Sequence, residues 1–200
     1  DQFRVYFSTR DENGKSKLAL IDLAIDDPQK ILKLHTKPLL PLGKAGTFDD
    51  DGIMPGFIMQ EQNELWMYYS GWNQRVTIPY HNATGLAFSD DGGEHFHRRF
   101  DGPIMDRTRD EPYIAVTPSI IKENNHWKMW YISGLRWEKI HEKYEPVYAI
   151  KYAHSDNGID WQREPALCVP QLHPLEAFSH PNVIKQNGIY RMWYCFRDSH

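Results

Sequence analysis

The sequence predicts an all-β fold, a β-propeller built from four-stranded antiparallel blades. Three prolines, Pro55, Pro118 and Pro181, stand 63 residues apart, each inside the same short apolar pattern. About ten residues after each proline comes an aromatic strand, and a fourth copy of that strand opens the chain at 3–8. No segment shows the 3.6-residue periodicity of an amphipathic helix. A repeat of this length, made of short strands, is typical of radially arranged sheets.

Each repeat divides into four predicted strands. In the first repeat, residues 53–115, we expect strands at 53–60, 65–70 and 83–89 and one around Phe96. In the second, residues 116–178, we expect strands at 116–122, 127–133 and 148–154 and one around Trp161. The turns at 61–64, 89–93, 123–125 and 155–158 contain the Asn, Asp and Gly residues that tight hairpins require. The Ser-Asp-x-Gly turns at 89 and 155 resemble the Asp-box hairpin of sugar-processing propellers, for which we expect a structural role.

The lengths of the connections separate two faces of the predicted propeller. Strands one and two, and strands three and four, are joined by tight turns, which lie together on one face of an up-and-down meander. The longer segments belong to the other face, and function concentrates on long loops held by a rigid scaffold. We expect these loops at 38–52, 71–82, 100–115, 134–147 and 164–179.

Composition excludes several classes of protein. A formal net charge of −4 with interspersed signs argues against a nucleic-acid partner. No stretch of about 18 apolar residues is present, so we expect no membrane partner. The sequence shows no secretory signal, but this says little about the compartment, which stays open with the cytoplasm slightly favoured. We expect Cys168 and Cys195 to be buried free thiols. The paired aromatic residues of the repeated strand are expected to pack between blades: Tyr68, Tyr69, Trp130, Tyr131, Trp193 and Tyr194.

Carboxylates occur just before each innermost strand. The three loops contribute Asp49 to Asp51, then Asp110 and Glu111, and then Glu176. Innermost strands line the axis of a propeller, so these groups are expected to converge on one pocket. A pair of carboxylates is what hydrolysis of a glycosidic bond needs, one as general acid and one as base or nucleophile. A single acid before a strand is commonly a solvated turn or cap residue, but three in corresponding places favour a functional site.

Aromatic and basic residues near these acids suit a sugar. We expect tryptophan and tyrosine rings to stack on sugar rings and arginines to orient hydroxyls or carboxylates. The candidates for substrate binding are Trp72, Arg75, Tyr80, Arg109, Tyr113, Trp137 and His180, with Arg107 beside them. For His180 and His81 we favour hydrogen bonding over metal ligation, and we expect neither a metal nor a cofactor. The chain contains no HExxH, GxSxG, GxGxxG or P-loop motif.

These segments resemble the five-bladed β-propeller glycosidases, the arabinanase/invertase/levansucrase-like superfamily with the fold of glycoside hydrolase families 43 and 32. The residues that carry the resemblance are 46–55, 111–118 and 176–181, with the aromatic strands and Ser-Asp-x-Gly hairpins. The resemblance implies that Glu176 is the general acid. The stretch Arg109-Asp110-Glu111-Pro112 is similar to the Arg-Asp-Pro element of invertases with one residue inserted, so either Asp110 or Glu111 fills that role.

The resemblance also implies five blades, which at this repeat length need roughly 315 residues. We therefore expect residues 1–200 to form one incomplete propeller domain with about three blades, and with partial blades at 1–52 and 179–200. The remaining blades are expected elsewhere in a longer chain, or less favourably in another chain.

The sequence predicts a glycoside hydrolase-like protein that cleaves an oligosaccharide or polysaccharide. Glu176 is the candidate acid, and Asp51 with Asp110 or Glu111 is the candidate base, nucleophile or orienting carboxylate. Two alternatives stay open. A glycoside phosphorylase needs a cationic phosphate pocket, for which Arg75, Arg107 and Arg109 are candidates. A non-catalytic carbohydrate-binding propeller would retain the aromatic platforms alone. Sugar identity, linkage, stereochemical outcome and oligomeric state are not fixed by these patterns.

Overall fold

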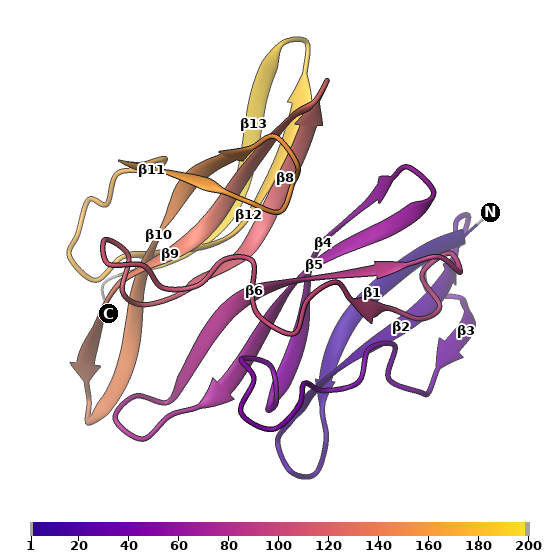
Figure 1. Ribbon diagram of the computed structural model, residues 1–200, viewed down its shortest axis with the longest axis horizontal. Coiled ribbons are helices and arrows are strands. Elements are labelled where there is room, and N and C mark those ends of the chain that lie inside the picture. The colour runs from indigo at the N-terminus through magenta and orange to yellow at the C-terminus, as the bar shows by residue number, and fades with distance from the viewer. Residues whose placement is uncertain (1, 199–200) are drawn as a thin grey trace.

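The computed structural model describes residues 2–198, and every regular element in that range is a β-strand (Figure 1). The extreme ends of the predicted domain, residue 1 and residues 199–200, lie outside the described range. The prediction of an all-β fold is confirmed. Among the described residues there is no helix that is long and apolar enough to cross a membrane.

The strands follow one another as antiparallel meanders. The first meander contains β1 (Gln2–Arg10), β2 (Ser16–Ala24) and β3 (Ile31–His35). The second contains β4 (Gly52–Glu61), β5 (Glu64–Gln74), β6 (Tyr80–Ser89) and β7 (His97–Arg98). The third contains β8 (Ala115–Glu123), β9 (His126–Ile140), β10 (Lys143–Ser155) and β11 (Gln162–Leu167). A final pair consists of β12 (Ala177–Gln186) and β13 (Ile189–Arg197).

The meanders are joined edge to edge only at single points. Ser16 of β2 pairs in parallel with Gly52 of β4, and Ala83 of β6 pairs in the same way with Ala115 of β8. The indigo and yellow ends of the chain lie at opposite sides of the molecule (Figure 1). Within residues 2–198 the strands do not close into a ring.

The three repeated prolines occupy matching positions on β4, β8 and β12. The pairing of each strand with its neighbour is irregular at this point, between Pro55 and Phe57, between Val116 and Ser119, and between Ser179 and Asn182. All three prolines line one cavity of about 230 Å³, which we call the axial cavity. Their equivalence is confirmed. A β-bulge re-aims the side chains around it, and here it does so in the same place three times.

Two of the predicted loops are wrong. Residues 71–82 and 134–147 are mostly strand, because β5 runs to Gln74 and β6 begins at Tyr80, while β9 and β10 are separated by only two residues. These two, His141 and Glu142, both have positive φ, at 46° and 66°, as a two-residue type I′ hairpin turn requires. Residues 135–145 at the distal end of the β9–β10 hairpin are all exposed or partly exposed, so no apolar alternation marks them as strand in the sequence.

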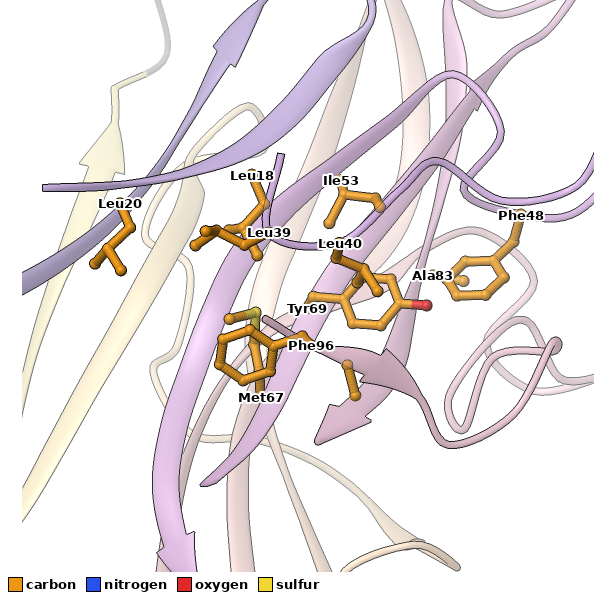
Figure 2. Close-up of a cluster of buried hydrophobic side chains, with 11 residues drawn as sticks. Leu18, Leu20, Leu39, Leu40, Phe48, Ile53, Met67, Tyr69, Ala83 and Phe96 are labelled. Atoms are coloured by element: carbon orange, nitrogen blue, oxygen red, sulfur yellow. The ribbon is translucent and has the colours of Figure 1, made fainter. Parts of the chain in front are cut away.

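The hydrophobic core lies between successive meanders. Figure 2 shows the first cluster, in which side chains from β2, β4, β5 and β6 meet those of the loop before β4. Burial of one leucine or phenylalanine side chain contributes about 1.5–3 kcal/mol. The residues of this cluster are Leu18, Leu20, Leu39, Leu40, Phe48, Ile53, Met67, Tyr69, Ala83, Ala87 and Phe96. A second cluster, around Tyr68, Met129 and Tyr131, joins the second meander to the third.

The predicted aromatic core is confirmed only in part. Tyr68, Tyr69 and Tyr131 are fully buried, whereas Trp193 is 57% exposed and Tyr194 39% exposed. Both exposed residues lie on β13, which pairs only with β12 in the described part of the chain. Trp130 is half-buried. The predicted burial of the two cysteines is wrong, since Cys168 and Cys195 are free but exposed.

The Ser-Asp-x-Gly turns have the predicted structural role. The Asp91 carboxylate accepts the backbone N–H groups of Glu94 and His95, each at 3.0 Å. In the next meander the Asn157 side chain accepts those of Ile159 and Asp160, at 2.8 and 2.9 Å.

Each of these turns is also fastened to the preceding meander. The Tyr6 hydroxyl donates to the carbonyl of Gly93 at 3.2 Å, and the Tyr68 hydroxyl donates to that of Gly158 at 2.9 Å. The same tyrosine-to-glycine contact thus joins the first meander to the second and the second to the third.

Candidate active site

Two neighbouring cavities lie where β5, β6 and β9 extend beyond the core. The larger, the Trp72 cavity, has a volume of about 390 Å³. Trp72 pairs with Asn82 and Gln74 pairs with Tyr80 across the β5–β6 hairpin, which brings all four to one end of it. The full lining is Arg10, Met54, Trp72, Gln74, Pro79, Tyr80 and Asn82.

The smaller one, the Arg75 cavity, has a volume of about 190 Å³. It is lined by Arg75, Val76, Thr77, Ile78, His81, Arg107, Pro112, Tyr113 and Trp137. The Tyr80 ring of the first cavity meets the Trp137 ring of the second edge-on, with centroids 5.2 Å apart. Five of the predicted substrate-binding residues therefore come together here: Trp72, Arg75, Tyr80, Tyr113 and Trp137.

Asp51 borders the Trp72 cavity at the start of β4. Its Oδ2 accepts the backbone N–H of Gln74 at 2.9 Å, and its Oδ1 lies 3.2 Å from Nζ of Lys15. The Gln74 hydrogen bond, together with the Lys15 ammonium, holds the pKa of Asp51 below its ordinary value of 3.8. Its side chain is a quarter exposed. Asp51 is thus an accessible, ionised carboxylate beside an aromatic cavity, as a base or nucleophile must be.

Glu111 lies in the interior of the third meander. Its side chain is 7% exposed and accepts hydrogen bonds from the hydroxyls of Tyr131 and Ser133, from Lys151 at 3.1 Å and from Arg163 at 3.0 Å. Burial alone raises the pKa of a carboxyl group, but here the bonds from Lys151 and Tyr131 and the charge of Arg163 outweigh it. The pKa of Glu111 therefore lies below its ordinary value of 4.5.

Asp49 has the same environment one meander earlier. It is fully buried and accepts hydrogen bonds from Tyr69 at 3.0 Å and from Arg98 at 2.8 and 2.6 Å. In both meanders the acid stands 20 residues before its tyrosine. A buried carboxylate enclosed by a tyrosine and an arginine in successive repeats is a structural ion pair. This geometry favours a structural role for Glu111.

Asp110 and Arg109 are not brought into either cavity. Their side chains form an ion pair with each other, 77% and 91% exposed. Neither residue lines the Trp72 cavity or the Arg75 cavity.

Glu176 is held at the end of the loop before β12. It is 7% exposed, and its Oε2 accepts the backbone N–H of Leu172 at 2.7 Å. Within residues 2–198 its Oε1 has no hydrogen-bond partner. One oxygen is therefore anchored and the other has no partner, and Glu176 lines neither the Trp72 cavity nor the Arg75 cavity.

The strand register relates Glu176 to Asp51. Ile53, Ala115 and Phe178 each pair with the residue four positions after a repeated methionine, Met67, Met129 or Met192. Asp51, Tyr113 and Glu176 each stand two residues before these equivalent positions. The repeat thus has an acid, a tyrosine and an acid at equivalent positions just before β4, β8 and β12.

The two histidines have different environments. His180 is exposed and lines the axial cavity rather than the Trp72 cavity. His81 is buried, and its Nε2 lies 2.7 Å from Oδ1 of Asp106 at the edge of the Arg75 cavity.

One cluster among the described residues has the composition of a metal site, Asp22, His35 and Glu94. Asp22 and His35 lie on the first meander, and Glu94 follows the turn at 89–93 that contacts this meander. Arg4 binds the carboxylates of Asp22 and Glu94, each at 2.9 Å. The arginine supplies the positive charge that a cation would bring. We therefore interpret this cluster as an ion-pair network.

Sequence reasoning missed several residues of this region. Arg10, Gln74 and Asn82 line the Trp72 cavity, but nothing in their local pattern marks them. Arg98 and Arg163, which bind the buried acids, do share a signal. Each follows an aromatic residue by two positions, in Phe96-His97-Arg98 and Trp161-Gln162-Arg163, at corresponding points of two repeats.

Comparison with known sequences finds two relatives in Mycobacterium tuberculosis. They are the uncharacterized protein Rv1502 of strain ATCC 25618 / H37Rv and the uncharacterized protein MT1551 of strain CDC 1551 / Oshkosh. Each is 34% identical over 200 residues, which cover 98% of this chain. The chain spans 65% of the length of each relative. No family model matches the sequence.

Comparison with solved structures finds glycoside hydrolases. A protein described as glycoside hydrolase superimposes with a TM-score of 0.75 at 15% identity, covering 99% of this chain and 59% of that one. A variant of the Bombyx mori GH32 beta-fructofuranosidase BmSUC1 in complex with sucrose gives 0.68 at 14%, covering 96% and 38%. The sucrose-6-phosphate hydrolase from Lactobacillus gasseri gives 0.69 at 12%, covering 96% and 37%. At such identities the likeness is one of fold, and the chain has a glycoside hydrolase-like, all-β fold.

Proposed function

We propose that this chain is the larger part of a glycoside hydrolase that cleaves a glycosidic bond in an oligosaccharide or polysaccharide. We further propose that its meanders are blades of a five-bladed propeller and that residues 1–200 hold about three of them. The carrying observation is the ionised Asp51 beside a cavity lined by Trp72 and Tyr80. Aromatic rings with a few well-placed polar groups are typical of a small-molecule site.

Two carboxylates carry the proposed chemistry. Asp51 acts as the base or nucleophile, because its low pKa keeps it charged at neutral pH. Glu176 acts as the general acid, which protonates the departing oxygen through the unbonded Oε1. The equivalent position of these two residues in the repeat supports the assignment. Glu111 is assigned to the interior ion pair and not to the reaction.

The aromatic residues position the sugar. Trp72 and Tyr80 form one wall, and Trp137 continues it into the Arg75 cavity through its contact with Tyr80. Asn82 offers a carbonyl oxygen, Oδ1, that is buried without a hydrogen-bond partner in the described residues, and a sugar hydroxyl could donate to it. Holding the ring against these groups orients the scissile bond between the two carboxylates.

The test is a survey of glycosides with the full-length protein. Aryl furanosides, aryl pyranosides and plant and bacterial polysaccharides are incubated with and without inorganic phosphate, and the released sugars are separated by chromatography. We expect release without phosphate, lost in Asp51→Asn and Glu176→Gln. Asp156→Asn, whose side chain is 90% exposed in a tight turn, is the control and should keep full activity.

Three results would contradict the proposal. Release only with phosphate would identify a phosphorylase, and sugar binding without any release would identify a binding module. Full activity in both Asp51→Asn and Glu176→Gln would place the reaction elsewhere in the protein.

A further inference from the structure

Two of the three arginines that line the two cavities have no ion-pair partner among the described residues. The chain contains 11 arginines, and eight of them form ion pairs in the described residues. The three without one are Arg10, Arg75 and Arg191. Arg10 lines the Trp72 cavity and Arg75 lines the Arg75 cavity. Two of the three unpaired arginines thus lie at the candidate active site.

The linings of both cavities lack acidic side chains. Neither Asp nor Glu is among the residues that line them, although the whole chain carries a formal charge of −4. Asp106 at the edge of the Arg75 cavity is engaged by His81 at 2.7 Å and lies 3.8 Å from Nε of Arg107. Asp51 at the edge of the Trp72 cavity is engaged by Lys15. Arg75 also lines a third cavity with Glu142 and Glu145, whose carboxylates pair with Lys139 and Arg197. Among the described residues Arg75 is therefore left without a carboxylate partner.

The arginines are also presented in a way that suits an anion. The Arg10 guanidinium lies over the Trp72 ring, 5.5 Å from its centroid, so its planar fork is supported without a carboxylate. Arg75 and Arg107 line the same cavity of about 190 Å³ together with the rings of Tyr113 and Trp137. That volume is below the range of about 300–1,000 Å³ for drug-sized ligands, so it suits one substituted ring.

We propose that the saccharide bound at this site carries a negative charge, and that Arg75 and Arg107 bind its anionic group. The inference rests on the proposed function, because it names the substrate class of the same site. The anionic group is a carboxylate, as in a uronic acid, or a phosphate ester. Guanidinium forks bind both groups through paired hydrogen bonds. Arg10 then contacts the neighbouring part of the saccharide in the Trp72 cavity.

The experiment compares matched ligands by isothermal titration calorimetry with the full-length protein. The ligands are galacturonate oligomers against galactose oligomers, glucose 6-phosphate against glucose, and inorganic phosphate alone. We expect one charged ligand to bind at least tenfold more tightly than its neutral parent, and this preference to fall at high salt. Which charged ligand binds distinguishes carboxylate from phosphate.

Variants connect the preference to the cavity. Arg75→Gln and Arg107→Gln should each reduce affinity for the charged ligand about tenfold more than affinity for its neutral parent. Arg191→Gln is the matched control, since Arg191 also lacks an ion pair but lies on β13 and lines neither cavity. Circular dichroism of each variant verifies folding.

The inference is overturned if charged and neutral ligands bind equally, or if Arg191→Gln has the same effect as Arg75→Gln. It is also overturned if inorganic phosphate binds as tightly as the sugar phosphate, because the site would then recognise a free anion. These outcomes differ from failure of the proposed function. A protein that releases sugar from a glycoside but binds charged and neutral saccharides equally would keep the hydrolase and lose the charged substrate.

Discussion

The Tyr131 hydroxyl donates a hydrogen bond of 2.9 Å to Oε2 of Glu111, deep in the third meander. The contact repeats that of Tyr69 with Asp49 one meander earlier. A residue that looks like half of a catalytic pair in the sequence is therefore part of a recurring internal ion pair. This relationship separates Glu111 from its neighbour Asp110 and makes their variants behave differently.

Glu111→Gln is expected to destabilise the fold strongly. It would leave Lys151 and Arg163, whose side chains are 11% and 14% exposed, without a buried counter-charge. Breaking a buried pair in this way costs about 3–5 kcal/mol of unfolding free energy. Asp110→Asn, at a side chain that is 77% exposed, should change stability by less than about 0.5 kcal/mol. Urea unfolding followed by tryptophan fluorescence measures both. Unchanged stability in Glu111→Gln with lost activity would show that Glu111 is catalytic.

Stability should fall in acid, and Glu111 should account for part of the slope. Its folded pKa is depressed, so its contribution is fully present above the ordinary value of 4.5 and is lost as pH falls through the lower folded value. We expect the unfolding free energy to decrease from about pH 5 toward about pH 3. Glu111→Gln should make that decrease shallower, leaving the slope due to other carboxyls such as Asp22, whose pKa is also lowered. Equal slopes in the two proteins would refute the linkage.

Tyr68→Phe should weaken the packing of the third meander against the second. The substitution removes the donor to the Gly158 carbonyl and leaves that buried acceptor without its partner. The expected loss is about 1–3 kcal/mol of unfolding free energy. Tyr144→Phe removes a hydroxyl from a ring that is 42% exposed, and it should cost less than about 0.5 kcal/mol. Chemical denaturation of both variants measures the two losses of unfolding free energy. Equal losses would mean that the Gly158 contact does not stabilise the fold.

The proposed roles of Glu176 and Asp51 predict that only the Glu176 variant responds to the acidity of the leaving group. An aryl glycoside with an acidic phenol departs with little need of protonation, so Glu176→Gln should retain most of its rate on that substrate. The rate on an unactivated glycoside should fall about 10²–10⁴-fold, as for loss of a general acid. Asp51→Asn should impair both substrates alike. Steady-state kinetics on a series of aryl glycosides distinguishes the two. If Glu176→Gln reduces all rates equally, it does not act as the acid.

Much of the fold could be predicted because prolines and glycines, each with its own backbone preference, recur at fixed positions of the repeat. Pro55, Pro118 and Pro181 mark the bulged strands β4, β8 and β12, and glycines at positive φ mark the turns at 93 and 158. The long β9–β10 hairpin could not be predicted in the same way, because both of its faces are partly exposed at the distal end.

The candidate site was harder to predict, because it depends on the exact level of each residue along its strand. Trp72, Arg75, Tyr80, Tyr113 and Trp137 were identified by residue type, and the structure brings them together. Whether an acid before a strand faces inward to an arginine or outward to a cavity is decided by a shift of one or two residues. In the same loop Asp49 faces inward to Arg98, whereas Asp51 faces outward beside the Trp72 cavity. Composition alone does not distinguish the two residues.

The tyrosine-to-glycine contacts also determine how the chain should lose its structure. Tyr6 links the first meander to the second, and Tyr68 links the second to the third, so both contacts join sheets that are neighbours in sequence. Cooperativity in such an array is nearest-neighbour in character, and its ends open before its middle. Backbone amides of β5 and β8, coupled on both sides, are therefore expected to exchange with solvent most slowly. In the 200-residue chain taken alone those of β1 and β13 should exchange first, whereas the further blades proposed for the full-length protein would protect them.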